Sequence, residues 1–518
     1  MNVASNSTSR SLRLAAAALV AVGLLAWGAP AAAQSFRVQC PETTAVHPTP
    51  GDTSKGQIKC QQIAGGDGYA TMGDGTQIYL FGFGPLSGLG DPTALPPIDG
   101  ILTGKPGTVS AKVFNDQTPT NKLRNKVEPA DIMNTGVLYS NAPAPMIAID
   151  EDDELFLTLS NVGMIMRPDL FEQHTVHFHG YPNASSFFDG VPDGSVAINI
   201  AGSFTYYYTA PDAGTYFFHC HIAPPEHLQM GMVGQLYVRP RQNRVAVGAS
   251  LYDALMAANN RNTATVTASV TPDTTGKCSD ILCTGATPLP AVNTGATGGG
   301  KYAYNDGDGT TRYDVEQPLQ MMGFDPNFHF VGMTFNPEAF ADMKDKYFLL
   351  NGRSYPDTIN TSVDNTGRTG SDGNALPNGP MATLSADGAS RPSQPVPSLI
   401  TLNKSGCAAT SNAPGPTCQT RALLRISDLS VTEHTTLATL GVTMTVIAQN
   451  ARLLRDLAGN NLYYDTNSIT LGGGESVDVI IDVSNVPAGT YYLYSTNLDH
   501  LSNDAENFGG MMTEIVVQ

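Results

Sequence analysis

Two short stretches of this chain each occur twice. Gly214-Thr-Tyr-Phe-Phe returns as Gly489-Thr-Tyr-Tyr-Leu, and Gln173-His-Thr-Val returns as Glu433-His-Thr-Thr. The two offsets, 275 and 260 residues, differ by only the length of a loop. Repetition at this spacing indicates two homologous units, which we expect to be joined near residues 240–300.

Short β-type runs separated by turn residues predict that both units are β-sandwiches. The chain has 52 glycines and 35 prolines, which alternate with runs rich in Val, Ile, Tyr, Phe and Thr. Helical periodicity is confined to residues 251–259 and 337–344. We therefore expect an all-β chain with a Gly-rich N-terminal extension (34–95), a first sandwich (96–242), a linker (243–300) and a second sandwich (301–518). The predicted strands include 154–159, 203–209, 215–218, 235–239, 423–426, 477–483 and 490–495.

The N-terminus has the pattern of a secretory signal. Arg10 and Arg13 precede an apolar run at 14–27, and three alanines at 31–33 form a small-residue cleavage site. No later stretch approaches the roughly 18 to 20 uninterrupted apolar residues of a membrane helix. We expect residues 1–33 to be removed and the mature protein to be periplasmic or secreted.

The net charge limits the choice of partners. It is -18 for the whole chain and becomes -20 without the two signal arginines. An acidic surface argues against nucleic acid or anionic membranes and favours cations or basic redox partners. The same charge is also typical of a surface that simply keeps an exported protein soluble.

Seven cysteines in an exported chain predict disulfides. The sequence alone does not fix the connectivity, but the simplest pairing joins near neighbours and leaves Cys220 over. The predicted pairs are Cys40 with Cys60, Cys278 with Cys283, and Cys407 with Cys418.

The unpaired Cys220 lies between His219 and His221 and is followed by His227 and Met232. A thiolate, an imidazole and a distant thioether are the ligand types of a blue-copper site. Successive side chains of a strand point to opposite faces, so Cys220 and its two histidine neighbours should serve different sites.

The segment from His174 to His179 divides in the same way. His177 and His179 share one face of a strand, and His174 has the opposite parity. Two ligand groups are therefore predicted, and both suit copper. The first is His174, Cys220, His227 and Met232; the second is His177, His179, His219 and His221.

Simpler explanations exist for each residue alone. A single strand histidine is commonly a partly buried packing residue, and a single methionine commonly belongs to the core. Zinc accepts the same ligand types. Zinc would not explain why the thiolate stands between two cluster histidines, an arrangement that gives electrons a short covalent route from one metal to the other.

His-x-x-His-x-His-Gly and His-Cys-His followed by His and Met resemble the copper motifs of multicopper oxidases. The resemblance implies Greek-key cupredoxin-like sandwiches in which a donor reduces type 1 copper and a trinuclear cluster reduces dioxygen. Asp189, in Asp-Gly-Val-Pro, resembles an acid that relays protons in some members, although it is also an ordinary turn residue. The resemblance assigns type 1 copper to His174, Cys220, His227 and Met232, type 2 copper to His177, and type 3 copper to His179, His219 and His221.

The chain departs from that family in its second unit. A full trinuclear cluster needs eight histidines from two domains, and only one half is present. By the repeat, His434 remains, but Leu437 and Thr439 replace His177 and His179, and Tyr494-Ser-Thr replaces His219-Cys-His. The other histidines of the second unit, His329 and His500, are either packing residues or ligands. His500 is similar to the histidine that completes type 2 copper across a trimer in copper nitrite reductases.

Copper nitrite reductases are the rival family. Pro224-Pro225 resembles their loop after the cysteine, but their catalytic Asp would fall at His177, and His221 would not be a histidine. The leading hypothesis is an exported multicopper-oxidase-like enzyme whose donor, a phenol or metal ion, delivers electrons near a solvent-facing His227. A homotrimer would complete the cluster. The alternatives are a non-catalytic type 1 copper carrier or copper-binding protein, and a nitrite-reductase-like enzyme.

Overall fold

The computed structural model describes most of the chain after residue 37. The described residues are 38–87, 108–115, 129–140, 142–180, 185–258, 280–289, 291–293, 301–331, 339–359, 397–405, 407 and 418–518. The predicted signal at 1–33 lies outside them. Residues 38–518 form one compact unit.

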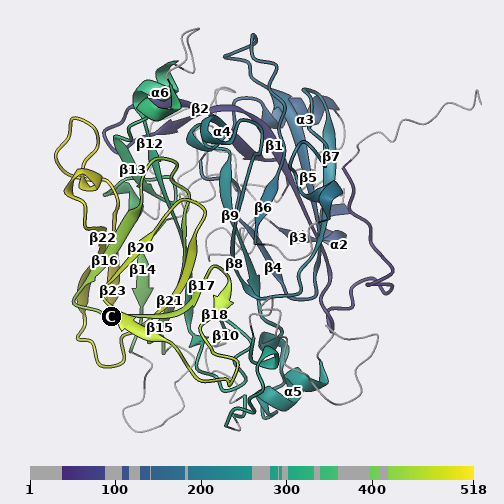
Figure 1. The fold of residues 1–518 in the computed structure, drawn as a ribbon, viewed down its shortest axis with the longest axis vertical. Coiled ribbons are helices and arrows are strands. Elements are labelled where there is room, and N and C mark those ends of the chain that lie inside the picture. The colour runs from purple at the N-terminus through teal and green to yellow at the C-terminus, as the bar shows by residue number, and fades with distance from the viewer. Residues whose placement is uncertain are drawn as a thin grey trace, which may run out of the picture. The chain divides into compact units, whose positions relative to one another are not determined.

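The first sandwich consists of two facing sheets (Figure 1). One has the order β2-β1-β5-β7, with β3 paired to β1. The other has the order β4-β9-β8-β6. Their strands are β1 (Ile58–Thr71), β2 (Gln77–Pro85), β3 (Val109–Ser110), β4 (Ile147–Asp150), β5 (Glu154–Gly163), β6 (His177–His179), β7 (Ser203–Thr209), β8 (Gly214–His219) and β9 (Val233–Arg239).

The second sandwich is built in the same way. One sheet has the order β13-β12-β15-β21-β17-β18, with β19 paired to β17, and the other has the order β14-β23-β22-β16-β20. Its strands are β12 (Val315–Phe324), β13 (Tyr347–Leu350), β14 (Ile400–Leu402), β15 (Arg421–Asp428), β16 (Thr435–Leu440), β17 (Met444–Gln449), β18 (Arg452–Leu453), β19 (Tyr464–Thr466), β20 (Ser468–Leu471), β21 (Ser476–Asp482), β22 (Gly489–Ser495) and β23 (Met512–Val517).

The two sandwiches share their strand directions as well as their strand order. In both, a parallel pair (β1 with β5, β12 with β15) is followed by an antiparallel strand (β7, β21). In the facing sheets, β4 runs parallel to β9 as β14 does to β23, and β8 and β22 hold equivalent central places. The predicted all-β fold with two homologous sandwiches is confirmed. Each predicted strand overlaps an observed one: β5, β7, β8, β9, β15, β21 and β22.

The Gly-rich segment predicted as an N-terminal extension contributes two long strands, β1 and β2, to the first sandwich. They correspond to β12 and β13 of the second. Several glycines of β1 are required by close packing. At Gly68, for example, a Cβ atom would lie 2.1 Å from the carbonyl oxygen of Ser140. A high glycine content here therefore marks crowded strands instead of loops.

Helices are short in the part of the chain that the structure describes. The predicted helix at 251–259 is α5 (Leu251–Ala257), capped by the Ser250 hydroxyl. The predicted helix at 337–344 is wrong, because the described residues there contain only a single 3-10 turn, Phe340–Asp342. The remaining short elements are α2 (Ala111–Asn115), α3 (Pro129–Gly136), α4 (Pro224–Gln229), α6 (Pro326–Val331), β10 (Lys301–Tyr302) and β11 (Arg312–Tyr313).

The cysteines pair as predicted wherever both partners are described. Cys40 is bonded to Cys60 and Cys407 to Cys418. Cys283 is also disulfide-bonded, and its predicted partner Cys278 lies outside the described residues. Cys220 is free and buried.

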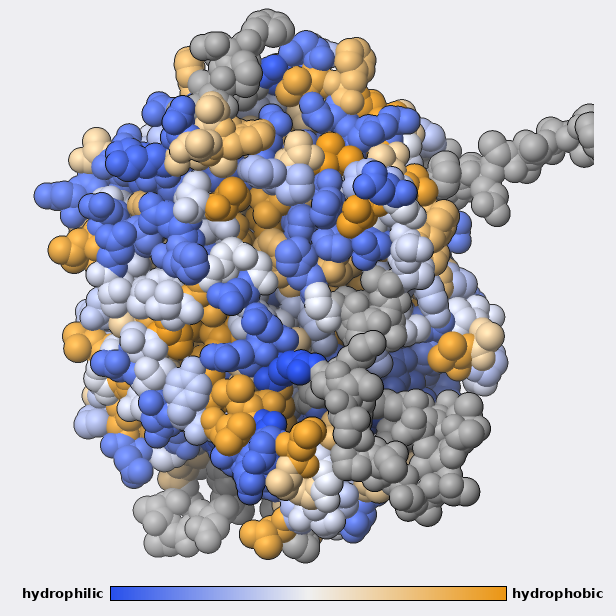
Figure 2. All heavy atoms as spheres, in the orientation of Figure 1, coloured by the Kyte–Doolittle hydropathy of each residue, from blue (hydrophilic) through white to orange (hydrophobic). Residues whose placement is uncertain are grey.

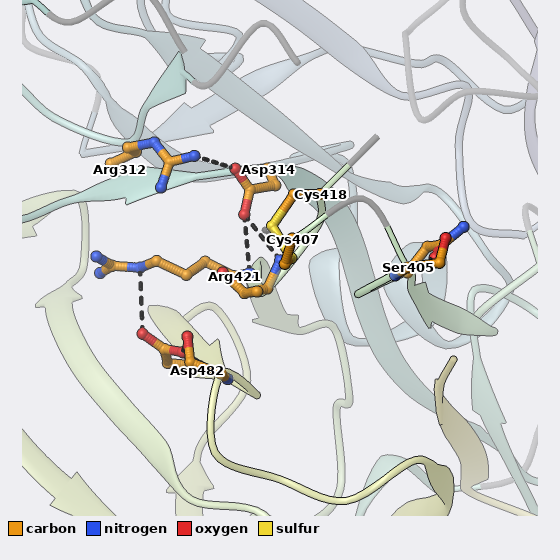
Figure 3. Close-up of a disulfide and its surroundings, with 10 residues drawn as sticks. Arg312, Asp314, Ser405, Cys407, Cys418, Arg421 and Asp482 are labelled. Carbon is orange, nitrogen blue, oxygen red and sulfur yellow. Dashed lines mark hydrogen bonds and ion pairs between the residues drawn. A yellow bond between two sulfur atoms is a disulfide. The ribbon is translucent and has the colours of Figure 1, made fainter. Parts of the chain in front are cut away.

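The disulfide of the second sandwich lies beside a row of charges (Figure 3). Asp314 pairs with Arg312 at 2.6 Å and accepts the backbone N–H of Arg421 at 3.0 Å. The Arg421 side chain extends to Asp482, 3.9 Å away. These contacts fix the start of β15 next to the disulfide.

The two sandwiches meet through the outer face of the sheet that contains β8 and β9. Thr215 of β8 donates to Asp478 of β21 at 2.6 Å, and Gln235 of β9 donates to Ser427 of β15 at 2.8 Å. Arg425 is fully buried in this contact and pairs with Glu316 at 2.9 Å. Both sandwiches therefore share one buried interface, and the histidine-bearing end of β8 lies at its margin.

No helix in the described ranges has the length and hydrophobicity needed to cross a membrane. On the face drawn in Figure 2, hydrophobic residues are scattered among hydrophilic ones.

Candidate copper centres

Strands β6 and β8 position both predicted ligand groups. They are antiparallel, with His177 opposite His219 and Phe178 opposite Phe218. Phe178, Phe218 and Cys220 belong to the core of the first sandwich, whereas the histidines point away from it. The alternation predicted from the sequence thus separates two groups of ligands on the two faces of one sheet.

The first group converges inside the sandwich. The donor atoms of His174, Cys220 and His227 lie within 4.8 Å of one another. His227 Nδ1 is 3.3 Å from Cys220 Sγ, and the backbone N–H of Thr175 points at the same sulfur from 3.4 Å. Met232 is next to Cys220 because the Cys220 N–H donates to its carbonyl at 3.0 Å.

Strands β1 and β2 close this group from the other side. A Cβ atom on Gly65 would lie 2.7 Å from the His174 ring and 3.3 Å from the terminal methyl of Met232. Phe81 packs its ring against His227 with a centroid distance of 5.1 Å. Only glycine at position 65 leaves room for both ligands.

The buried nitrogens of this group fit a metal better than any protein partner. Neither ring nitrogen of His174 has a hydrogen-bond partner among the described residues, although the side chain is fully buried. A buried polar group left unpaired costs about 1 to 3 kcal/mol, so an unpartnered imidazole aimed at a thiol indicates a missing ligand. Burial also holds the pKa of His174 well below its usual range, which keeps the ring neutral and able to bind copper.

His227 is not solvent-facing, contrary to the prediction. Its side chain has no exposed surface, and its Nε2 atom faces Glu172 Oε2 at 3.6 Å. Burial alone would lower its pKa, but the neighbouring Cys220 and the Glu172 carboxylate outweigh burial and raise the pKa to about 9. Glu172, partly exposed, is therefore the group that connects His227 to the surface. Glu172 lies two residues before His174, so in an extended chain both side chains point to the same side. This spacing is visible in the sequence and could have identified Glu172.

The second group lies on the opposite face of β6 and β8. Ligand atoms of His177, His179 and His219 lie within 4.8 Å of one another. His179 Nε2 and His219 Nε2 are 2.8 Å apart, and the His221 ring lies 5.0 Å from that of His177. Burial is the main cause that lowers the pKa of His179 to about 4 and that of His219 to about 3.

Backbone carbonyls fix two of these imidazoles. His177 Nδ1 donates to the carbonyl of Asp189 at 2.6 Å, and His219 Nδ1 donates to the carbonyl of Cys220 at 2.7 Å. Since a carbonyl only accepts, the protons are on Nδ1 and the Nε2 lone pairs are free to bind a metal. His219 Nε2 can then accept a hydrogen bond from His179 Nε2, 2.8 Å away, and a metal bound by both nitrogens would replace this hydrogen bond.

Asp189 lies beside the second group. Its carboxylate oxygen is 3.6 Å from His177 Nδ1, and its side chain is about one-third exposed. The next residue, Gly190, has φ = +78°, and a Cβ atom there would lie 1.9 Å from the carbonyl oxygen of Val176. The turn therefore holds Asp189 close to the start of β6. There its carboxylate lies beside His177 and is partly exposed to solvent.

The strand pairing in the second sandwich aligns it with the first sandwich differently from the short sequence repeat. Ala438 lies opposite Tyr494 as His177 lies opposite His219, so Ala438 and Leu440 hold the places of His177 and His179. The sequence repeat had assigned Leu437 and Thr439, which point into the core instead. A one-residue shift moves every side chain to the other face of a strand, which is why the short repeat misassigned them.

The histidines of the second sandwich have different environments. His329 and His500 are buried, and His434 is exposed. His500 is buried and held by Ser495 at 3.1 Å and Glu433 at 2.9 Å within its own sandwich, which favours a packing role over a ligand role. His329 Nδ1 donates to the carbonyl of Tyr79.

A protein-family model matches a large part of the first sandwich. Residues 113–242 match the family model described as multicopper oxidase. The matched residues include all eight predicted copper ligands. In the curated protein "Multicopper oxidase MCE" of Talaromyces pinophilus, 28% of 146 aligned residues are identical, covering 27% of this chain and 22% of that protein. In "Laccase abr2" of Aspergillus fumigatus, 33% of 104 residues are identical, covering 20% of this chain and 16% of that protein.

Two solved structures of copper proteins resemble the fold of this chain. The blue copper oxidase of Nitrosomonas europaea is 16% identical, with a TM-score of 0.48, and the match covers 89% of this chain and 86% of that one. The copper nitrite reductase of the same organism is 13% identical, with a TM-score of 0.43, and the match covers 89% and 94%. The chain spans about a fifth of the length of the two curated relatives.

Proposed function

We propose that this protein is a copper-dependent oxidase. Type 1 copper would be held by His174, Cys220, His227 and Met232, and further copper by His177, His179, His219 and His221. Bound copper would supply one-electron chemistry that couples oxidation of a phenol or metal ion to reduction of dioxygen. The observation that carries the proposal is the opposite placement of Cys220 and His219, adjacent in the chain, in two converging ligand groups.

The protein's own groups divide the remaining tasks. Glu172 provides a carboxylate next to His227 that can accept a hydrogen bond from a phenol or attract a metal cation. The peptides that join Cys220 to His219 and to His221 are the shortest covalent links between the groups. Asp189 can take protons from solvent and hold them beside His177, because its carboxylate is partly exposed and 3.6 Å from the ring.

We propose that a homotrimer completes the second group, since one chain supplies only half of the usual histidines. His434 is the best candidate for a ligand offered to a neighbouring subunit, because it is exposed while His329 and His500 are enclosed. Substituting His434→Ala should then lower the copper content without changing the type 1 spectrum. An unchanged copper content would exclude His434 from this role.

The disulfides favour an oxidising compartment, so we propose that the protein is periplasmic or secreted. The acidic chain suits a cationic or small-molecule donor and not nucleic acid or membranes.

Copper content, electron paramagnetic resonance (EPR) and oxygen uptake test the function together. About four copper ions per chain with oxygen uptake support the oxidase, about one without uptake supports a type 1 carrier, and about two supports a nitrite-reductase-like enzyme. The carrier keeps its place as an alternative because only half of the second group is present. A single-copper protein that consumes no oxygen with any reductant would refute the oxidase.

A further inference from the structure

The copper-ligand loop of the first sandwich has a definite pattern of backbone hydrogen bonds. The N–H of Cys220 donates to the carbonyl of Met232 at 3.0 Å, and the N–H of Met232 donates to the carbonyl of His227 at 2.8 Å. Strand β9 begins at the next residue, Val233. The loop thus brings three ligand positions together before the chain re-enters the sheet.

The same pattern occurs at the end of β22 in the second sandwich. The N–H of Ser495 donates to the carbonyl of Met511 at 2.9 Å, and the N–H of Met511 donates to the carbonyl of His500 at 2.7 Å. Strand β23 again begins at the next residue, Met512. Ser495, His500 and Met511 therefore occupy the places of Cys220, His227 and Met232.

The histidine side chains of the two loops are also placed alike relative to Ser495 and Cys220. His500 Nδ1 lies 3.1 Å from Ser495 Oγ, as His227 Nδ1 lies 3.3 Å from Cys220 Sγ. Each histidine is on a short helical turn, α4 in the first sandwich and the 3-10 turn Leu498–Leu501 in the second. Ser495, His500 and Met511 are all buried. The spacing between histidine and methionine differs, so the match lies in the hydrogen bonds and not in loop length.

Two separate strand pairings identify the residue of the second sandwich that corresponds to His174, the fourth ligand position. Ala438 corresponds to His177 by its pairing with Tyr494, which places Thr435 at the position of His174 three residues earlier. Thr435 also pairs with Leu471 as His174 pairs with Ile198. Thr435 is buried, as His174 is.

We infer that Ser495, His500, Met511 and Thr435 preserve the framework of a type 1 copper site in the second sandwich, with its thiolate and one imidazole replaced. The inference rests on the type 1 assignment in the first sandwich. A serine hydroxyl is neutral and a poor ligand for copper, so His500 is held by Ser495 and Glu433 in place of a metal. Restoring the soft and imidazole donors should restore copper binding. The new thiol would release its proton to solvent when its thiolate binds Cu(II).

The decisive variant combines Ser495→Cys and Thr435→His with Cys220→Ser in the full chain. The last substitution removes the first thiolate, so any thiolate-to-copper absorption must come from the second sandwich. We expect intense visible absorption and about one more bound copper per chain than in Cys220→Ser alone. A folded variant that binds Cu(II) without this absorption would overturn the inference.

Thr435→His adds volume at a buried position and could prevent folding. A second variant without this substitution therefore tests the inference as well. Ser495→Cys alone in the Cys220→Ser background is nearly isosteric and leaves three donors. We expect it to show thiolate-to-metal absorption with Cu(II) or Co(II), lost when His500→Ala is added. Ser398→Cys is the matched control, because Ser398 is a buried hydroxyl of the same sandwich near a backbone carbonyl.

If Ser495→Cys and Ser398→Cys show the same thiolate-to-metal absorption with Cu(II) or Co(II), the inferred framework is refuted. The proposed oxidase is judged separately, by the absorption of the wild-type protein. A wild type without blue copper would count against the oxidase, whereas the second framework is measured after Cys220 has been removed.

Discussion

The two sandwiches have one strand plan and different chemistry. Both place a ligand-loop position after the central strand, β8 or β22, and both return the chain through a buried methionine. The first has a thiol and two imidazoles at the three ligand positions beside its methionine, and the second has two hydroxyls and one imidazole. Backbone hydrogen bonds and packing hold the two loops in the same form although their side chains differ, so the form of the loop does not depend on the ligand side chains.

Substituting the residue at the cysteine position of each sandwich, Cys220 or Ser495, should give the largest contrast. Cys220→Ser should abolish the visible absorption of type 1 copper completely, because the absorption arises from the thiolate. Ser495→Ala should leave it unchanged. Absorption spectra of the copper-loaded variants check both, and loss of colour in Ser495→Ala would show that the first ligand group depends on the loop of the second sandwich.

The second ligand group should be separable from the first. His177→Ala should reduce oxygen uptake by about 100-fold or more while type 1 absorption persists, because His177 is on the opposite face of the sheet from Cys220. Oxygen consumption with a reductant and EPR on the same sample measure both properties. If colour is lost together with uptake, the groups are not independent.

The second sandwich also holds the first ligand group in place. Gln229, in the helix of His227, donates to the buried Asp345 at 3.0 Å, and Asp345 accepts from Thr432 at 2.6 Å. Supporting contacts of this kind commonly contribute about 10-fold or more to metal affinity, so Asp345→Asn should weaken copper retention by about 10-fold.

Competition with a copper chelator measures the effect of Asp345→Asn. Asp306→Asn is the matched control, since Asp306 is also a buried carboxylate but bonds to Thr311 and Gln242. Equal copper retention in both variants would remove Asp345 from the support of the site.

The smallest expected effect is a pH dependence at the contact of the two sandwiches. Burial lowers the pKa of His329 to about 4, while hydrogen bonds to the backbone of Tyr79 and Gln229 oppose it. The unfolded chain, with a pKa near 6.5, binds more protons between these values, so stability falls as pH drops from about 6.5 towards 4.

His329→Gln should reduce this loss by at most about 1.4 kcal/mol per pH unit. Urea unfolding of the metal-free protein at several pH values between 4 and 7 provides the measurement. An identical pH slope in wild type and variant would show that His329 does not titrate with unfolding.

Much of the fold and of the first ligand group could be predicted from the sequence. Alternation along β6 and β8 separates the ligands, and the cysteine left unpaired is the buried thiol. The one-residue error in β16 could not be avoided, because short repeats do not fix strand register and hydrogen bonds do. Gly65 and Glu172 join the site only through tertiary contact between distant strands.

The contrast in exposure between the two ligand groups has a consequence for how copper enters the protein. His174, Cys220, His227 and Met232 have no exposed surface, whereas His179 is exposed. Copper bound as proposed would load the second group from solution. It would reach the first through a local opening, which we assign to α4 because this helix carries His227, or before the chain has finished folding. The slow phase of copper uptake would then measure the opening rate of α4, and a chelator would strip the two groups in the order in which they fill.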